Sequence, residues 1–407
     1  MTPPASFLVV AHSARLLAQS AARGGHPVRA LDLFNDSDTG RFAQCAEAVD
    51  ARGGEAPGFD RADLLRRAQR LCPPAQCLGL VYGAGFEDDT ITLGLLARGR
   101  VLVGNGPDLI ARLKDPVTFF ALLDRLAIAH PETVLSAPAD RRGWLYKRRG
   151  ATGGAHVIDA QAVRAMPAPG EGYFQRRAPG RNLSMLFLAD GRRLDVIGFS
   201  EQLTVRRDPH RYTYAGAFGP ARVPAAVSRT LRDRIEALVA QTGLVGCNSV
   251  DFLLDRNRIC VLEVNPRPSA TIDLYDPDWP CGLFDAHLRA CAGELPGPAA
   301  RLRARRVRAH AIVYASAAMR TTHESGFPAW CSDVPRAGSA VAMDAPVCTV
   351  HAEGTDVAGA RRQLGRRRRQ VEGKLAEQRN SEETEHGFKP TPAKREPRGR
   401  SPGCVAA

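Results

Sequence analysis

The sequence lacks the features that mark a membrane protein, a disulfide scaffold or a zinc protein. No run of 18 apolar residues is present, which excludes a membrane-spanning helix. The start, MTPPASFLVV, has neither the basic region nor the apolar length of a signal peptide. The ten cysteines form no C-x-x-C pair and the ten histidines show no zinc-ligand spacing, so free thiols in a reducing compartment are expected. The composition therefore predicts a cytoplasmic protein.

Lysine is also scarce, since five lysines stand against 51 arginines and only Lys114 and Lys147 occur in the first 373 residues. Lysine is a compact charge on a flexible stem and suits single phosphate oxygens, whereas arginine is a planar fork. Its retention at two positions of an arginine-rich chain favours a phosphate contact at both. Chance in a biased composition is the alternative.

Lys114 directly precedes a predicted helix. Asp115 and Pro116 are typical of an N-cap and of the first helical position, and Phe120 and Leu123 continue with helical spacing. Backbone N–H groups at a helix start also favour anions, so we expect Lys114 to lie near phosphate.

Lys147 lies at the entrance of a predicted hairpin. The apolar stretch 144–146 is expected to form one strand and 155–158 its partner. Glycines between them give a flexible turn whose backbone could close over phosphates, although a plain turn is the alternative. These glycines are Gly150, Gly153 and Gly154.

A second predicted hairpin lies further along the chain. Two apolar runs, 250–254 and 259–264, are separated by the tetrapeptide DRNR. If the turn centres on Asn257, Asp251 lies opposite Glu263, whereas a slip of one residue would place them on different faces.

Asn265 follows Glu263 by two residues and shares its face of the strand. Two carboxylates and an amide oxygen suit Mg²⁺. The alternative is that Asp251 and Glu263 are solvated strand residues, but acidic residues inside apolar runs are costly to bury unpaired. The hairpin therefore predicts a metal site formed by Asp251, Glu263 and Asn265.

These segments resemble the ATP-grasp superfamily and, within it, the ATP-dependent carboligases (carboxylate–amine ligases) of bacteria and archaea. The resemblance extends over most of residues 5–355, and LEVNPRPS at 262–269, with an acid twelve residues before its glutamate, is its most specific part. It implies that the predicted metal site holds one or two Mg²⁺ (or Mn²⁺) ions against the phosphates of ATP. It also implies that Arg267 is the catalytic residue that meets the substrate carboxylate or its acyl phosphate, a role that suits a guanidinium.

The resemblance implies a larger set of ATP-binding residues. Family members usually carry acids where Arg176 and Asn182 stand. Asn182 can still bond a ribose hydroxyl, whereas Arg176 cannot accept a hydrogen bond from the adenine amine. The full set is Lys114, Lys147, Gly150, Gly153, Gly154, Gln175, Arg176, Arg177 and Asn182.

The implied fold class is α/β and α+β: an ATP-grasp fold, whose two α+β subdomains clamp ATP, follows an N-terminal α/β domain with a parallel sheet. Loops at the carboxyl ends of parallel strands bind ligands, so the N-terminal loops and an aromatic loop at 208–220 supply substrate candidates. These are His12, Ser13, Arg15, Glu87, Tyr212 and Tyr214. The expected boundaries are 1–106 for the N-terminal domain, 107–172 and 173–295 for the two subdomains, 296–360 for a small C-terminal β region, and 361–407 for a basic, disordered tail.

The tail carries seven of the thirteen net positive charges of the chain. A basic tail can bind nucleic acid nonspecifically, but a solvated tail is the favoured interpretation. The expected partners are accordingly ATP, a small-molecule carboxylate and an amine, with no membrane and no nucleic acid, and a homodimer is allowed.

The expected function is an ADP-forming ligase. A substrate carboxylate takes the γ-phosphoryl group of ATP, and an amine then displaces phosphate from the acyl phosphate. Some relatives belong to gene sets for tetrahydromethanopterin, which implies a role in a pterin cofactor pathway. Two alternatives stay open: an ATP-dependent carboxylase that uses bicarbonate, although the residues after Arg267 lack the acid-and-histidine stretch of biotin carboxylases, and a nonenzymatic protein that binds nucleic acid through its tail.

Overall fold

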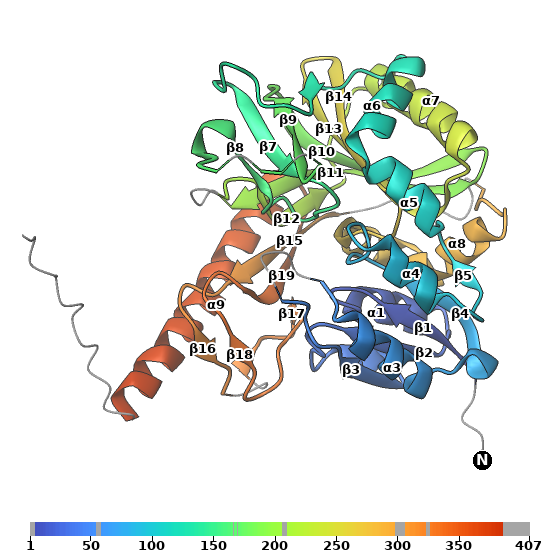
Figure 1. The fold of residues 1–407 in the computed structure, drawn as a ribbon. Coiled ribbons are helices and arrows are strands. Elements are labelled where there is room, and N and C mark those ends of the chain that lie inside the picture. The colour runs from blue at the N-terminus through green and yellow to red at the C-terminus, as the bar shows by residue number, and fades with distance from the viewer. Residues whose placement is uncertain are drawn as a thin grey trace, which may run out of the picture.

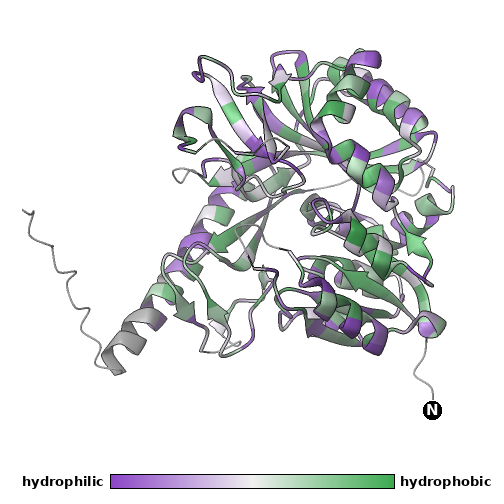
Figure 2. Ribbon diagram, viewed as in Figure 1, coloured by the Kyte–Doolittle hydropathy of each residue, from purple (hydrophilic) through white to green (hydrophobic). Residues whose placement is uncertain are grey.

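The computed structural model describes residues 5–53, 58–165, 167–168, 170–205, 210–297, 306–322 and 326–385, with side chains up to residue 378. Three main sheets are arranged around a central junction (Figure 1). Hydrophobic residues concentrate on the central strands of these sheets (Figure 2). None of the helices in this described part is long and apolar enough to cross a membrane.

The N-terminal sheet is parallel and has the order β3-β2-β1-β4-β5. Its β-α-β start forms as the sequence predicts, because an apolar strand is followed by a helix that buries its small residues and ends at Gly24. The elements are β1 (Ser6–Val10), α1 (Arg15–Arg23), β2 (Val28–Asp32), α2 (Thr39–Phe42), β3 (Cys45–Ala48), α3 (Arg61–Leu71), β4 (Cys77–Tyr82), α4 (Thr90–Leu96) and β5 (Leu102–Val103).

A four-stranded antiparallel sheet with the order β6-β9-β7-β8 follows two helices. Lys114 is the last residue of the first helix and Asp115 caps the second, accepting a hydrogen bond from the Thr118 amide at 2.9 Å. Lys114 thus lies between two helices rather than only before one. The elements are α5 (Pro107–Lys114), α6 (Pro116–Arg125), β6 (Thr133–Val134), β7 (Trp144–Arg148), β8 (Val157–Asp159) and β9 (Gly172–Arg176).

The largest sheet has eight strands in the order β14-β13-β10-β11-β12-β15-β19-β17. Helix α7 ends at Gly243, which adopts a left-handed conformation with φ of 76°. The elements are β10 (Arg181–Asp190), β11 (Leu194–Val205), β12 (Thr213–Gly219), α7 (Ala225–Thr242), β13 (Val245–Asp255), β14 (Arg258–Asn265), α8 (Gly282–Cys291), β15 (Val307–Tyr314), β17 (Cys331–Ser332) and β19 (Pro346–Gly354). A separate pair consists of β16 (Met319–Arg320) and β18 (Ala340–Val341).

Two expected boundaries differ from the structure. Strand β9 ends at Arg176, so the chain passes between the two sheets at 177–180 rather than at 172. The expected small C-terminal region is not separate, because β15 and β19 extend the eight-stranded sheet.

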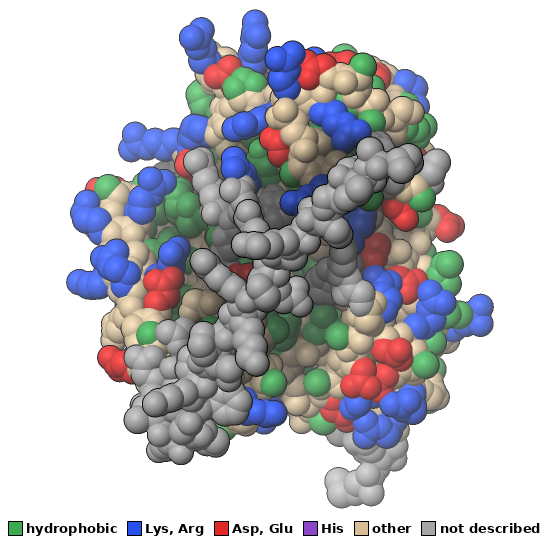
Figure 3. Space-filling model, turned by 60° about the vertical axis from the view of Figure 1, so that its left-hand side comes forward, with side chains coloured by type: hydrophobic (Ala, Val, Ile, Leu, Met, Phe, Trp, Pro, Cys, Tyr) green, Lys and Arg blue, Asp and Glu red, His purple; other side chains and the backbone are tan. Residues whose placement is uncertain are grey.

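The C-terminal helix α9 (Val357–Glu385) begins before the expected tail and continues through its first 25 residues. It is held to the sheet by the buried side chains of Ala360, Leu364 and Val371, which pack on β15 and β19. The expectation of disorder is therefore wrong for 361–385, and 386–407 lie outside the described residues. On the face drawn in Figure 3, basic side chains are interspersed with acidic ones rather than gathered in one patch.

Candidate functional site

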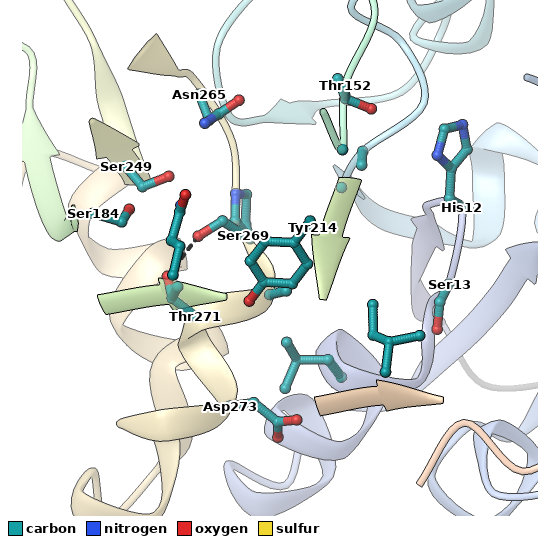
Figure 4. Close-up of a pocket in the computed structure, with 18 of the residues that line it drawn as sticks. His12, Ser13, Thr152, Ser184, Tyr214, Ser249, Asn265, Ser269, Thr271 and Asp273 are labelled. Atoms are coloured by element: carbon teal, nitrogen blue, oxygen red, sulfur yellow. Dashed lines mark hydrogen bonds between the residues drawn. The ribbon is translucent and has the colours of Figure 1, made fainter. Parts of the chain in front are cut away.

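A cavity of about 410 Å³ lies where the sheets meet. Its walls include the loop after β1, the glycine-rich loop after β7, strands β10 to β15, the segment after β17, and strand β19. Figure 4 shows Tyr214 near the middle, with Asn265 and Thr152 on one side of it and Asp273 and Ser13 on the other. We call the part around Asp251, Glu263 and Asn265 the metal end, and the part around Arg15, Asp273, Asp333 and His310 the acidic end.

The metal end depends on the register of β13 and β14. The strands close with Asp255 opposite Arg258, a register that alone would place Asp251 opposite Leu262. A β-bulge shifts the register by one residue, so Asp251 faces Glu263 instead. The predicted pairing is confirmed, but its assumed turn centre is wrong and the bulge supplies the missing residue.

Three oxygen-bearing side chains converge there as expected. The Asn265 amide donates to Asp251 Oδ2 at 3.2 Å, and Gln202 donates to Asp251 Oδ1 at 3.0 Å. Among the described residues, no group of three or more His, Cys, Asp and Glu side chains can hold a metal ion. A cation here would thus have two carboxylates and an amide oxygen, the donors that Mg²⁺ accepts when water and phosphate complete its shell.

Both lysines act on the carboxylates of this end, although neither lines the cavity. Lys114 Nζ donates to Glu263 Oε2 and to Asn265 Oδ1, each at 3.0 Å. Burial lowers the pKa of Lys147, and Glu263 and Asp251 oppose that shift. Burial and Glu263 raise the pKa of Asp251, whereas Lys114 and Lys147 outweigh burial and lower the pKa of Glu263. The two ammonium groups and two carboxylates therefore form one interacting cluster.

The glycine-rich loop closes against the cavity. Thr152, Gly153 and Gly154 line it, and the Gly153 carbonyl accepts from the Tyr214 amide at 2.8 Å. Gly154 has φ of 75°, and a β-carbon there would collide with the Tyr212 carbonyl oxygen. Glycine is needed at this position for both reasons. The loop is held over the cavity by the aromatic segment that the sequence analysis named as a substrate candidate.

Arg267 lies between the metal end and the N-terminal domain. It is 9 % exposed, lines the cavity, and its Nε donates to Glu87 Oε1 at 2.7 Å. Glu87 also accepts from the amides of Gly85 and Phe86. Although burial opposes it, Arg267 holds the pKa of Glu87 at about 2. Glu87 therefore acts on Arg267 and does not itself line the cavity.

The expected adenine-binding residues are only partly at the cavity. Asn182 lines it, but Gln175 is buried and donates to Thr133 Oγ1 at 3.1 Å. Arg176 is exposed and its guanidinium stacks on Trp144 at 4.7 Å from the ring centroid. Arg177 donates its amide to the Gly143 carbonyl. Gln175, Arg176 and Arg177 thus lie on or just after β9, and their assignment to ATP stays a prediction.

The acidic end contains expected and unexpected residues. His12, Ser13, Arg15, Tyr212 and Tyr214 line the cavity as proposed from the sequence. Sequence reasoning missed the residues that meet Arg15, because they come from segments about 260 and 320 residues away and carry no motif. These are Asp273, which follows β14, and Asp333, which follows β17; His310, on β15, was also missed.

Comparison with known proteins agrees with this geometry. Residues 114–271 match the model of an ATP-grasp domain family. The carbamoyl phosphate synthase large chain of Halomonas eurihalina is 25 % identical over 223 residues, covering 49 % of this chain and 20 % of that protein. The same large chain of Myxococcus xanthus is 25 % identical over 230 residues, covering 52 % and 21 %. The chain thus spans about a fifth of the length of these curated relatives.

Solved structures share the fold. A pyruvate carboxylase of Rhizobium etli gives a TM-score of 0.66 at 16 % identity, covering 89 % of this chain and 37 % of that chain. N5-carboxyaminoimidazole ribonucleotide synthetase in its ADP complex gives 0.66 at 16 % identity, covering 90 % and 96 %. Residues 114–271 of the chain therefore form an ATP-grasp domain.

Proposed function

We propose that this protein is an ATP-dependent ligase that activates a small-molecule carboxylate as an acyl phosphate and joins it to an amine. The observation that supports this most directly is the convergence of Asp251, Glu263 and Asn265 with Lys114 and Lys147 at one end of a cavity. A site of lysines and carboxylates without a covalent nucleophile suits phosphoryl transfer, which needs positioning and charge stabilisation above all.

The residues of the metal end would divide the work. Asp251, Glu263 and Asn265 would hold Mg²⁺, which neutralises phosphate charge when bound. Lys114 bonds Glu263 and Asn265, which supports a role for its ammonium on the phosphate oxygens of ATP. Lys147 and the glycine-rich loop would cover those oxygens from the other side. Asn182, which lines the cavity, would meet the ribose.

Arg267 would orient the reacting carboxylate. Its Nε is bonded to Glu87, and among its terminal nitrogens only a 3.3 Å bond from Nη1 to the Pro268 carbonyl is present in the described structure. The terminal edge of the guanidinium can therefore pair with a substrate carboxylate. In the proposed reaction a carboxylate oxygen bonds to the γ-phosphorus as ADP leaves. The amine nitrogen then bonds to the acyl carbon, phosphate leaves, and the nitrogen gives up one proton.

The finer expectations stay predictions. Nothing in the described part of the structure bears on the pterin pathway or on the cytoplasmic location. The bicarbonate alternative differs in its acid substrate alone, so it is separated by experiment. The nucleic-acid alternative depends mainly on residues beyond 385, and the mixed charge of the face in Figure 3 gives it no support.

The test is ADP release with Mg²⁺ and a panel of carboxylates and amines, with mass detection of the amide. We expect ADP release only when both partners are present. ADP release with bicarbonate in place of the organic carboxylates would favour the carboxylase. Removal of the tail should be done after residue 385, because a cut at 361 would delete the buried Leu364 and Val371. A salt-dependent gel shift seen only with the tail, together with no ADP release, would contradict the proposed function.

A further inference from the structure

Arg15 at the acidic end is already fully paired. It is 3 % exposed, and its guanidinium donates to both oxygens of Asp333 at 3.0 and 3.1 Å and to both oxygens of Asp273 at 3.4 and 3.2 Å. Nη1 also donates to Gln19 at 2.8 Å. A guanidinium has five N–H donors, and these contacts engage the whole fork. Arg15 therefore has no free edge for a substrate anion.

The acidic end carries more negative than positive charge. The two carboxylates that meet Arg15 leave one negative charge over, and Arg15 lowers the pKa of Asp273 and Asp333 despite burial. His351 Nε2 lies 3.7 Å from Asp273 and adds a cation only when it is protonated. Asp333 also accepts from Ser13 and Ser332, but Asp273 has only the Arg15 and His351 contacts among the described residues. Asp273 thus keeps capacity for another donor.

A buried imidazole faces the same space. His310 is 2 % exposed and lines the cavity, and burial lowers its pKa to about 4, so it is neutral near pH 7. Its Nε2 is 2.7 Å from the Tyr214 hydroxyl, while its Nδ1 has no hydrogen-bond partner in the described structure. Buried polar atoms are normally paired, so His310 is an exception among the residues that line the cavity.

Part of the cavity wall is apolar and suits a short hydrocarbon. Leu16, Leu17, Ala270 and Ile312 line the cavity together with Tyr214. Tyr214 lies between Asn265 and Asp273 in Figure 4, and both Asp251 and Asp273 contribute to the raised pKa of its hydroxyl. A molecule held at Asp273 can thus extend past Tyr214 toward the place where the acyl phosphate would form.

We propose that the acidic end binds the amine co-substrate as a cation, with an ammonium group on Asp273 beside His310. The inference rests on the proposed function for the identity of the reaction but not for the binding itself. The substrate class is a short diamine. One nitrogen is held as an ammonium on Asp273, the other reaches the acyl phosphate as a free amine and is the nucleophile, and the bound end carries no carboxylate because Arg15 cannot receive one.

Three probes of four carbons separate the charge classes: 1,4-diaminobutane, succinate and 1,4-butanediol. Calorimetric titration at pH 8 keeps the diamine charged and histidine largely neutral. We expect saturable binding of the diamine and none of the other two. Succinate binding in preference to the diamine would overturn the proposal.

Variants then locate the bound diamine. Asp273→Asn should weaken its binding at least about tenfold, as expected for a lost charge-assisted contact. Asp251→Asn, at the metal end, should leave it within about twofold, and so should Asp285→Asn, whose carboxylate bonds His26 outside the cavity. If Asp251→Asn removes binding and Asp273→Asn does not, the diamine occupies the metal end and the proposal is wrong.

Asp273→Asn also removes part of the Arg15 pairing, so a second variant guards against misfolding. Ile312→Lys keeps the acidic pair and places an ammonium in the cavity, and it should also abolish diamine binding while far-ultraviolet circular dichroism stays unchanged. Retained binding in a folded Ile312→Lys variant would contradict the site. Diamine binding without ADP release on any substrate panel would sink only the ligase function. ADP release with an unchanged amine KM in Asp273→Asn would sink only the present inference.

Discussion

The two ends of the cavity differ in how far apart their charged residues lie in the sequence, and they carry different net charge. At the metal end, two ammonium groups balance two carboxylates, and the carboxylates come from one hairpin. At the acidic end, one guanidinium faces two carboxylates, and the three charges come from residues 15, 273 and 333. The balanced end suits a cation that arrives with a polyanion such as ATP. The unbalanced end suits a cation that arrives alone.

The two ends also differ in how much of the fold is needed to form them. The metal end depends on the register of two adjacent strands. Insertion or deletion of one residue in the turn or bulge would therefore place its side chains on different faces of the sheet. The acidic end joins the N-terminal domain to both halves of the large sheet, so it forms only after the whole chain has folded. A variant in the first end should therefore harm chemistry, and a variant in the second should harm stability as well.

The largest expected effect concerns the metal end. Asp251→Asn and Glu263→Gln each keep size and remove one negative charge. We expect either to lower ATP turnover at least about a hundredfold, because metal-ion stabilisation of a transferred phosphoryl group is worth several kcal/mol. ADP-release rates at saturating Mg²⁺ measure this. The Asn265→Ala effect should be smaller, since water can replace a neutral ligand.

The matched control is Glu201→Gln on β11, whose carboxylate bonds Arg181 in the same sheet. It should turn over ATP at nearly the wild-type rate. Wild-type turnover in both Asp251→Asn and Glu263→Gln would refute the metal assignment and with it the contrast between the two ends.

The metal end was predictable because its signal is local. The alternation of Asp251, Glu263 and Asn265 with apolar residues indicates a shared face, and strand periodicity is short-range. The β-bulge could not be predicted. The turn is shorter than the sequence suggested, and the bulge shifts the register by one residue, so the predicted pairing of Asp251 with Glu263 still forms. The sequence pattern therefore indicates which residues pair, but not the turn geometry or the bulge that brings them opposite each other.

The acidic end could not be predicted, since nothing in the sequence links Arg15 to a carboxylate more than 300 residues later. The C-terminal helix was missed for a related reason. Its charge-rich composition is typical of a solvated segment, but only every third or fourth residue, such as Leu364 and Val371, needs to be apolar to hold it to a sheet. The average composition of the segment does not reveal this narrow apolar stripe.

The second prediction tests whether the acidic end also holds the domains together. Arg15→Ala leaves two buried carboxylates without their cation, and breaking a buried ion pair typically costs about 3–5 kcal/mol of stability. Urea unfolding should show a lower midpoint and an earlier loss of signal from the N-terminal domain. Arg232→Ala, which removes an exposed pair with Glu236 on α7, should show no measurable change. Equal stability of both variants would mean that the acidic end is not a structural junction.

The third prediction separates ATP binding from carboxylate activation within the metal end. Lys147→Met should weaken ATP binding by about 1–3 kcal/mol, the range for a lost charge-assisted contact. Arg267→Lys keeps a cation beside Glu87 and removes the planar fork, so ATP affinity should stay nearly unchanged while turnover falls. Calorimetric titration with ATP and ADP-release rates on the same preparations distinguish the two. A loss of ATP affinity in Arg267→Lys equal to that in Lys147→Met would place Arg267 on the nucleotide.

The smallest expected effect lies outside both ends. Arg176 stands where family members usually have an acid, yet its guanidinium packs on Trp144, reaches the Arg142 carbonyl and lies 3.7 Å from Glu132 on an exposed surface. Its backbone amide is also occupied, since it donates to the Glu132 carbonyl at 2.8 Å. Arg176→Ala should therefore change ATP affinity less than about twofold and cost at most about 1 kcal/mol of stability, the range for an exposed cation–π contact.

Arg176→Glu is the sharper version, because it installs the acid that the ATP-grasp resemblance implies at this position. If the side chain points away from the nucleotide, this variant should neither tighten ATP binding nor raise the preference for ATP over GTP, and repulsion from Glu132 should make it slightly less stable than Arg176→Ala. A tenfold gain in ATP affinity would show that position 176 reaches the adenine. The nucleotide-binding part of the cavity would then have to extend beyond Asn182 to β9. The size of the nucleotide, rather than that of the amine, would determine the length of the cavity.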